Sequence, residues 1–546
     1  MENNFQSVFG FTIGPIYEMM SHSQKTRELW FSSFFFSWYV KKFYDELSGT
    51  KGVEILSPHF YPTKPPGKSK AGLFPDHIVG GINQDSVQCM KLLKDKNIII
   101  SNFFIEEIVK LGSYLVGKKG IIETIFKDYL QTSFVVLSAE GLVRKKIVET
   151  VDVHLDALER NRSFSLGKNE DTCYRCKTLP SVFKITDKYD KKIKEQKVCP
   201  FCFFKFKSNE SDNVCTETGQ SKQFRYRSTG EISADELIRG LDKSKLKKYL
   251  DDYDEISFDF NTQEGKAFSD LINGKKVEDY HKYMAIVVAD GDSLGKIANN
   301  VDDPQKFSDT LFEFGKIATN ITEQFHGEPV YLGGDDLLSF MPAAFLMDDK
   351  IITVLDYIKS LSTNYSAKLT DIGQNGTISF GIHLFYYKSP LSTALKDARN
   401  LLYEAKNERG KNSVILQLTQ HSGQQVKIKF NLGSSLLTNF SELLSGFISG
   451  NIKYPEGIHH NVSRYRTLLT NLNDPCQIDY FLENRFNEDI HKNQKDDLQK
   501  LFDLLKEMLT YKTNGSSHII NGELDVSALD EFLSQLRFIK FLAGDK

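Results

Sequence analysis

Two short stretches decide the fold: Tyr283-Met-Ala-Ile-Val-Val-Ala-Asp-Gly-Asp292, an apolar run that ends in carboxylates, and Tyr331-Leu-Gly-Gly-Asp-Asp336, an acidic turn between apolar segments. Around them the pattern of apolar residues predicts strands at 283–289, 328–332, 337–341, 377–386 and 412–418, and helices at 306–325, 350–361 and 391–408. This order is the β-α-β-β-α-β order of the ferredoxin-like unit. Its third strand lies antiparallel beside its first, so we expect Asp290, Asp335 and Asp336 to converge.

Three clustered carboxylates repel one another unless a cation lies between them, and hard divalent ions such as Mg²⁺ or Mn²⁺ prefer oxygen ligands. The sequence therefore predicts a two-metal site for nucleotidyl transfer, held by Asp290, Asp335 and Asp336 with the carbonyl of Gly291. Gly333 and Gly334 would let the backbone turn tightly and approach a nucleotide. The alternative is that Gly-Gly-Asp-Asp is only a solvated hairpin turn and Asp-Gly-Asp only a strand end.

The predicted helix at 391–408 adds cations to this candidate site. Lys406 falls near the end of the helix, where it can reach a triphosphate, and Lys411 lies just beyond it. The alternative is that both lysines are ordinary cations favoured by the helix dipole. Asp292 and Ser293, which follow the first strand, complete the candidate nucleotide-binding residues.

Two paired cysteine motifs predict a second metal site. Cys173-Tyr-Arg-Cys176 and Cys199-Pro-Phe-Cys202 supply four thiols at a spacing that suits tetrahedral, structural zinc. Redox pairs or an iron-sulfur cluster are the alternatives. Cys89, Cys215 and Cys476 have no partner pattern, and we interpret them as ordinary thiols.

At these residues a family resemblance becomes specific. The segment 283–414 resembles the cyclase and diguanylate-cyclase palm superfamily, and Asp290-Gly-Asp-Ser-Leu-Gly-Lys296 with the Gly-Gly-Asp-Asp turn resembles the large subunit of type III CRISPR effector complexes. The stretch from Phe11 to Ser33 is similar to the opening of the first palm in the Cmr-type, or III-B, large subunit. The resemblance implies an ATP-using enzyme that is switched on when a complex of Cmr-type subunits and guide crRNA pairs with target RNA. Its product would be cyclic oligoadenylate or AMP joined to S-adenosylmethionine.

The amino-terminal segment predicts a short strand, a turn at Gly14-Pro15 and a long helix from about 16 to 46, whose aromatic face we interpret as core. The resemblance implies that this half is a degenerate palm without the acidic turn. Many family members carry a nuclease domain with a His-Asp pair ahead of it. This chain begins with the first palm and contains no His-Asp dipeptide, so we expect no DNA cleavage by this subunit.

The predicted fold class is α+β and multidomain, with two ferredoxin-like palms, a zinc-binding insertion and a helical carboxy-terminal domain. The expected domains are a first palm at 1–165, a zinc-binding and helical linker at 166–275, a catalytic palm at 276–420 and a helical domain at 421–546. A chain of 546 residues with 40% hydrophobic content holds ample core for these domains.

With a net charge of −3, the chain as a whole has no positive electrostatic potential that would attract nucleic acid. RNA contacts would therefore use local basic patches or partner subunits. No apolar stretch is long enough to span a bilayer and the first residues lack a signal-peptide pattern, so we expect a cytoplasmic protein without membrane contact. Two other classes stay open. One is a nucleic-acid-binding scaffold with an inactive palm, and the other is a stand-alone diguanylate-type cyclase.

Overall fold

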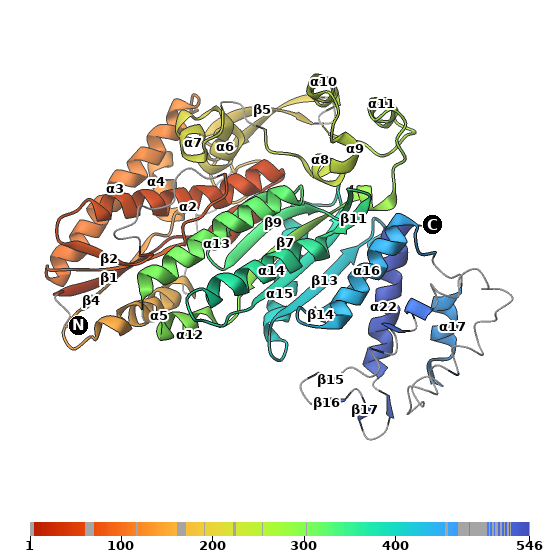
Figure 1. Cartoon of the computed structure of the whole chain (residues 1–546). Coiled ribbons are helices and arrows are strands. Elements are labelled where there is room, and N and C mark those ends of the chain that lie inside the picture. Colours follow the sequence, from red (N-terminus) through yellow and green to blue (C-terminus); the bar gives the residue numbers. More distant parts are fainter. Residues whose placement is uncertain are drawn as a thin grey trace.

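The computed structural model describes residues 5–59, 70–115, 118–160, 171–189, 192–221, 225–253, 255–301, 303–453, 457–467 and 526–544, with several short stretches between 480 and 524. Cys476 and part of the expected carboxy-terminal helices lie outside the described residues. Figure 1 shows an amino-terminal sheet, a larger central sheet, a module that covers one end of both, and carboxy-terminal helices at the far side.

The amino-terminal sheet has four strands in the order β2-β3-β1-β4, and all of its pairings are antiparallel. Its strands are β1 (Ser7–Thr12), β2 (Val53–Ser57), β3 (His77–Ile82) and β4 (Ser133–Ser138). Its helices are α1 (Ile16–Ser21), α2 (Thr26–Ser48), α3 (Ser86–Lys110), α4 (Lys119–Tyr129) and α5 (Ile147–Arg160). The third strand lies beside the first, which is the ferredoxin-like arrangement. The first palm predicted from the sequence is therefore present.

The single helix expected at 16–46 is wrong, because the chain breaks between α1 and α2. Lys25 has extended backbone angles, and the Glu28 side chain accepts a hydrogen bond from the Gln24 N–H at 3.0 Å, which ties the chain before the break to the first turn of α2. The Thr26 hydroxyl donates to the Arg227 carbonyl at 2.6 Å, so this break docks against the covering module. The aromatic side chains of α2 are buried in the core, as predicted.

The central sheet has six strands in the order β14-β13-β12-β7-β9-β8. Its strands are β7 (Tyr283–Gly291), β8 (Glu328–Gly333), β9 (Asp336–Pro342), β12 (Ile378–Tyr386), β13 (Ser413–Thr419) and β14 (Gln425–Asn431). Its helices are α12 (Leu294–Asn300), α13 (Pro304–Gln324), α14 (Val354–Thr370) and α15 (Leu391–Asn407). β7 pairs antiparallel with β9 on one side and β12 on the other. The predicted α+β fold with two ferredoxin-like palms is confirmed.

Two local expectations need correction. The helix expected at 350–361 is preceded by a hairpin of β10 (Ala344–Met347) and β11 (Lys350–Thr353), and α14 begins only after Thr353, which forms a capping box with Asp356. The segment after 420 begins with strand β14 rather than a helix. Its residues alternate between buried and exposed, a period of two that belongs to a strand at the edge of a sheet.

Helices follow β14 in the described carboxy-terminal part: α16 (Ser435–Ser449), α17 (Ile458–Arg464) and α22 (Val526–Ala543). Short strand pairs lie between α17 and α22, formed by β15 (Lys512–Thr513) with β16 (Ser516–Ser517) and by β17 (Ile519–Ile520) with β18 (Glu523–Leu524). The boundaries between the four expected domains stay a prediction.

The covering module begins with a hairpin of β5 (Phe183–Tyr189) and β6 (Lys192–Val198). Short helices follow: α6 (Pro200–Lys207), α7 (Asp212–Thr218), α8 (Thr229–Ser233), α9 (Asp235–Ile238), α10 (Lys243–Tyr253) and α11 (Gln263–Leu271). Figure 1 shows this module in yellow and green above both palms. None of the helices in the described part of the chain combines the length and apolar character needed to cross a membrane.

The two palms pack directly against each other through one continuous hydrophobic cluster. Gly72 forms a parallel bridge with Tyr331 of β8, and the Leu332 N–H donates to the Gly72 carbonyl at 3.1 Å. The first palm therefore contacts the strand that leads into the acidic turn.

Candidate active site

The acidic turn joins β8 to β9 at one edge of the central sheet. Gly333 pairs with Asp336 across the turn, and Gly334 has a φ of +74°, a conformation that favours glycine. β7 ends at this same edge. A side chain at Gly291 would place its Cβ 2.7 Å from the Asp335 Cβ, so the close approach of the two segments requires glycine there. The structure thus brings Asp290, Asp335 and Asp336 together.

The electrostatics of this cluster are repulsive. Burial and the nearby charge of Asp290 raise the pKa of Asp335 to about 7. Burial and the charges of Asp335 and Asp290 raise the pKa of Asp336 well above its ordinary value. Carboxylates in this state bind a divalent cation in place of protons, because the cation relieves both the repulsion and the loss of solvent.

Lys406 is the cation that the protein itself places at this cluster. Its Nζ lies 2.7 Å from Asp290 Oδ1, and it also donates to the Gly291 carbonyl oxygen at 2.7 Å. Both acceptor atoms belong to residues that we predict from the sequence to be metal ligands. The ammonium group therefore balances the charge of Asp290 within the chain.

Asp292 lies deeper than the other carboxylates and is buried. Its oxygens accept hydrogen bonds from the Thr377 hydroxyl at 2.7 Å, the Ser379 hydroxyl at 2.9 Å and the Asn412 N–H at 2.9 Å. The carboxylate thereby ties the end of β7 to the start of β12 and to the turn after α15. Sequence reasoning missed these three partners, since none of them belongs to a recognisable motif.

Ser293 and Lys411 lie on the other side of Asp292. Ser293 has a φ of +58°, and the Lys411 Nζ lies 3.4 Å from its hydroxyl oxygen. Together they line a hollow of about 450 Å³ with polar residues of neighbouring turns, among them Ser366, Thr370 and Asn375. This hollow adjoins the acidic edge.

A larger cavity of about 740 Å³ opens between the two palms at the acidic cluster. The second palm contributes Asp290, Asp336, Arg399, Tyr403 and Lys406, and the first palm contributes Tyr17, Glu18, Asp76 and Glu159. The residues of the first palm come from separate elements far apart in the sequence. No sequence motif could have predicted that these residues lie together.

The wall from the first palm is acidic. Ligand atoms of Asp76, His77 and Glu159 lie within 4.8 Å of one another, a set that can hold a metal ion. Glu159 accepts from the Thr12 hydroxyl and lies 3.1 Å from His77 Nε2. Although burial disfavours the charged ring, hydrogen bonds to Asp152 and Glu159 raise the pKa of His77 to about 10. The charge of Asp76 also contributes to the raised pKa of Asp336, so the two acidic groups face each other.

The wall from α15 is cationic and aromatic. Arg399, Tyr403 and Lys406 follow one another at spacings of four and three residues, so they share one face of the helix. The Arg399 guanidinium lies 4.1 Å from the centre of the Tyr17 ring, and the Tyr403 side chain is 72% exposed. An exposed ring between two cations suits a nucleotide, whose base is flat and whose phosphates are negative.

The four predicted zinc ligands also come together. The sulfur atoms of Cys173, Cys176, Cys199 and Cys202 lie within 4.8 Å of one another and are buried. Cys176 Sγ and Cys199 Sγ are 3.9 Å apart, far beyond the roughly 2 Å of a disulfide and close to the roughly 3.8 Å between thiolates on tetrahedral zinc. The cluster can therefore hold zinc.

Lys205, which lies on α6 together with Cys202, links this cluster to the cavity. Its buried ammonium donates to the Met19 carbonyl of α1. Tyr17 and Glu18 of the same helix line the cavity between the palms. The cysteine cluster thus supports one wall of the candidate active site.

Comparisons with known proteins agree with this arrangement. Residues 283–415 match the family described as Cas10/Cmr2, second palm domain, and residues 8–95 match the amino-terminal family of the CRISPR-associated protein Cmr2. The CRISPR system Cmr subunit Cmr2 of Pyrococcus furiosus is 29% identical over 212 residues, which cover 33% of this chain and 23% of that protein. The match therefore spans about a quarter of the relative's length.

Two solved structures share the fold over nearly the whole chain. The apo state of a type III-B Cmr-beta complex matches with a TM-score of 0.60 and 13% identity, covering 89% of this chain and 77% of the matched chain. The Cmr-beta complex bound to cognate target RNA matches with a TM-score of 0.59 and 12% identity, covering 98% and 82%. The paired palms of this chain therefore have the fold of the matched chains of these type III-B complexes. Over these two palm segments the chain is similar to the Cas10/Cmr2 family of large III-B subunits.

Proposed function

We propose that this chain is the nucleotidyltransferase subunit of a type III-B CRISPR effector complex. Its second palm would use ATP to make an adenylate second messenger when the guide crRNA of the assembled complex pairs with target RNA. The observation that carries the proposal is the convergence of Asp290, Asp335 and Asp336 beside Lys406, with Asp290 and Asp336 at the wall of a nucleotide-sized cavity.

The chain's own residues divide the work between them. Asp290, Asp335, Asp336 and the Gly291 carbonyl would hold two Mg²⁺ or Mn²⁺ ions. Bound there, the ions would lower the pKa of the attacking hydroxyl and balance the charge of the leaving pyrophosphate. Lys406 would exchange its contact with Asp290 for the triphosphate. Asp292 would keep the loop between these groups in place through its buried hydrogen bonds.

The backbone of the loops would cradle the phosphates. Gly333 and Gly334 carry no side chain between the acidic turn and an incoming nucleotide, and Ser293 with Lys411 offers a hydroxyl and an ammonium in the adjoining hollow. Tyr403 would cover the base, because its exposed ring lies between the two cations of α15.

The acidic wall favours one of the two acceptors that the family resemblance implies. Asp76 and Glu159 face the reaction centre from the first palm. A second ATP would bring its negative triphosphate toward these carboxylates, which costs free energy unless cations compensate. S-adenosylmethionine carries a positive sulfonium and a positive ammonium, which the same carboxylates attract. We therefore favour AMP joined to S-adenosylmethionine over cyclic oligoadenylate.

The proposed partners follow from the similarity to the Cmr-type large subunit. Other Cmr-type subunits would contact this chain, and guide crRNA and target RNA would reach it mainly through the complex. The four clustered cysteines would hold structural Zn²⁺. A cytoplasmic location stays a prediction.

The test is a double substitution, Asp335→Ala with Asp336→Ala, in a reconstituted complex supplied with radiolabelled ATP. We expect no labelled product, with complex assembly and target RNA binding unchanged, because Asp336 lines the cavity and is exposed and Asp335 is only partly buried. Loss of assembly in the same variant would assign these residues a structural role instead.

A further inference from the structure

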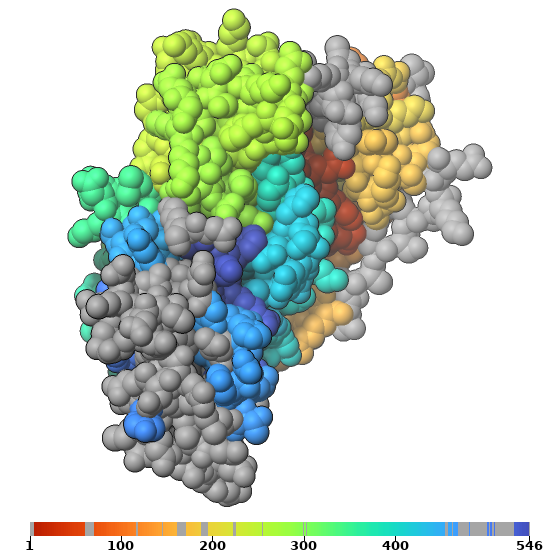
Figure 2. Space-filling view, turned by 90° about the vertical axis from the view of Figure 1, so that its right-hand side faces the viewer, coloured from red at the N-terminus to blue at the C-terminus, as the bar shows by residue number. Residues whose placement is uncertain are grey.

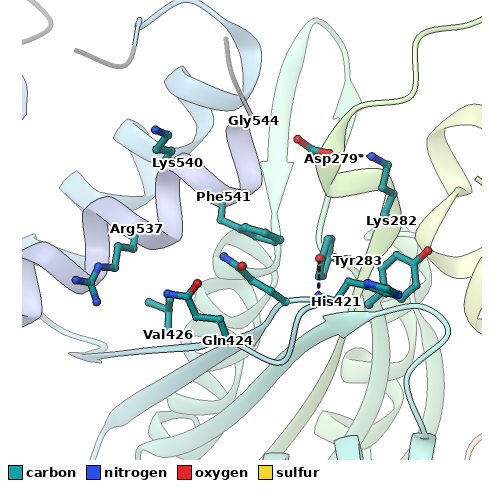
Figure 3. A pocket seen from close by; sticks show the side chains of 12 residues that line it. Asp279, Lys282, Tyr283, His421, Gln424, Val426, Arg537, Lys540, Phe541 and Gly544 are labelled. Atoms are coloured by element: carbon teal, nitrogen blue, oxygen red, sulfur yellow. Dashed lines mark hydrogen bonds and ion pairs between the residues drawn. The ribbon is translucent and has the colours of Figure 1, made fainter. Parts of the chain in front are cut away.

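Figure 3 shows a second cavity, which Tyr283 at the start of β7 lines. β7 begins at this cavity with Tyr283 and ends at the acidic edge with Gly291. A strand of this length separates the two ends by about 27 Å at roughly 3.4 Å for each residue. The cavity of about 540 Å³ is therefore a separate site.

Four segments build this cavity, and one of them is the end of β12 at Tyr386. The other three are the short 3-10 helix η3 (Asp279–Lys282) with the start of β7, the turn between β13 and β14 with the start of β14, and the carboxy-terminal helix α22. Figure 2 shows α22 in dark blue at the surface, next to the cyan palm segment and below the green covering module. The described residues around the cavity thus lie on an accessible face of the protein.

Aromatic rings form one side of the cavity. The Phe541 and Tyr283 rings meet edge to face with centres 5.0 Å apart, and the Tyr386 and His421 rings do so at 4.7 Å. Figure 3 shows Phe541 directed from α22 toward Tyr283, with His421 and Gln424 below them. The His421 side chain is exposed, while Tyr386 and Phe541 are half-buried, so ring surface remains open to a ligand.

Cations surround these rings. Arg537 and Lys540 of α22 are exposed, and Lys282 pairs with Asp279 at 2.9 Å. Among the described residues that line the cavity, Asp279 is the only acidic one. Positive charge therefore exceeds negative charge at this site, although the whole chain carries a net charge of −3.

The excess of positive charge affects His459 on the neighbouring helix α17. The Arg537 Nε donates a hydrogen bond to His459 Nε2 at 2.9 Å, which requires a neutral imidazole. Burial and the charges of Arg537 and Lys540 lower the pKa of His459. An anion at this site would meet cations and a neutral histidine.

We propose that this cavity binds a nucleotide unit of single-stranded RNA. Its volume suits one nucleotide. Arg537 and Lys540 would contact phosphates, the open rings of His421 and Tyr386 would stack on a base, and the amides of Gln420 and Gln424 would pair with base edges. An acidic peptide could pair with the cations but has no group that matches stacked rings beside two amides. Single-stranded RNA as the ligand therefore accounts for more of the residues in this cavity.

Fluorescence anisotropy with the full-length chain and a labelled eight-nucleotide single-stranded RNA tests this inference. The double substitution Arg537→Glu with Lys540→Glu should weaken RNA binding at least tenfold. It should also reduce the slope of log affinity against log salt by about 1.4, since each phosphate contact on a single strand contributes about 0.7. His421→Ala removes an exposed ring and should weaken binding about tenfold without affecting the fold.

The matched control is Lys247→Glu with Lys248→Glu on α10, which changes the charge of an exposed surface by the same amount outside the cavity. It should leave RNA binding unchanged. Equal weakening by both charge reversals would overturn the proposal in favour of diffuse attraction. Displacement of the RNA by micromolar AMP would assign the cavity to a free nucleotide instead. Unchanged RNA binding, with loss of another subunit from the reconstituted complex in native mass spectrometry, would assign it to a protein partner.

Discussion

The Lys406 ammonium lies 2.7 Å from an oxygen of Asp290, at the point where α15 meets the end of β7. This ion pair joins the cation that would bind a triphosphate to a carboxylate that would bind a metal. In the chain alone the two charges compensate each other. Substrate and metal would have to enter together and separate the pair, which makes Lys406 and Asp290 the most informative residues for the proposed reaction.

Lys406→Met should lower the rate of adenylate formation about 100-fold or more, the usual loss when one charged group that stabilises a transition state is removed. The same variant should bind Mn²⁺ more tightly without nucleotide, because Asp290 and the Gly291 carbonyl lose a competing donor. Lys411→Met is the matched control and should cost less, since Lys411 contacts Ser293 and not the acidic cluster. Turnover assays and calorimetric Mn²⁺ titration check this. A rate unchanged by Lys406→Met would remove Lys406 from the mechanism.

The stability of the protein without divalent cations should depend on Asp335. Its pKa is raised to about 7, whereas an aspartate in the unfolded chain releases its proton near pH 4. Between these values the folded chain binds the proton and the unfolded chain does not, so rising pH lowers the stability. The melting temperature of Asp335→Asn minus that of wild type should therefore grow from pH 5 to pH 8, as thermal melts without added metal would show. A difference that stays constant with pH would contradict the buried, repulsive state of Asp335.

Asp292→Asn should behave in the opposite way and lower the melting temperature. The buried carboxylate accepts hydrogen bonds from Thr377, Ser379 and the Asn412 N–H, and an amide nitrogen in place of one oxygen would leave donors facing donors. A buried donor without an acceptor costs about 1–3 kcal/mol. Thermal melts of both variants at pH 8 should show Asp335→Asn above wild type and Asp292→Asn below it. If both variants shift in the same direction, the distinction between repulsive and structural carboxylates is wrong.

Asp76→Asn and Glu159→Gln should each reduce the product that contains S-adenosylmethionine by tenfold or more while ATP binding persists. The reason is that both carboxylates line the wall that faces the acidic turn and would hold the positive acceptor. Asp152→Asn is the control, because Asp152 contacts the same histidine, His77, without lining the cavity. Chromatography of products against isotopically labelled S-adenosylmethionine provides the measurement. Equal loss in the Asp152 variant would point to a general disturbance of the first palm.

The cysteine cluster should hold one zinc ion for each chain. Cys199→Ser should remove that zinc and lower the melting temperature by several degrees, while Cys215→Ser should retain it, because Cys215 lies outside the cluster. Loss of zinc should also weaken substrate binding, since Lys205 connects the cluster to α1. Elemental analysis with thermal melts measures both effects. Retention of zinc in Cys199→Ser would show that the site is not the one predicted.

The order of strands and helices in the second palm was predictable from the sequence, because its apolar runs and its acidic turn are local patterns. The pairing of β7 with β9 then follows from the ferredoxin-like topology. This pairing places Asp290 close to the acidic turn. The break before Thr26 was not predictable, since it depends on the Arg227 carbonyl of a distant module. Strand β14 was missed because its exposed lysines gave the segment a polar character.

The acidic wall of the cavity was also beyond the reach of sequence reasoning. Asp76 precedes a strand and Glu159 lies on a helix, and each alone is an ordinary surface carboxylate. Only the packing of the first palm against β8 places them opposite Asp336. The buried partners of Asp292 likewise come from three separate segments.

The most direct measurement is mass spectrometry of the products formed by the reconstituted complex from ATP, Mg²⁺ or Mn²⁺ and S-adenosylmethionine, with and without complementary target RNA. We predict an adenylate-containing product only when target RNA is present, with the mass of AMP joined to S-adenosylmethionine. Detection of a cyclic oligoadenylate would support the proposed nucleotidyltransferase activity but would contradict S-adenosylmethionine as the acceptor. No product with either metal would contradict the account and leave the chain as a scaffold with an inactive palm.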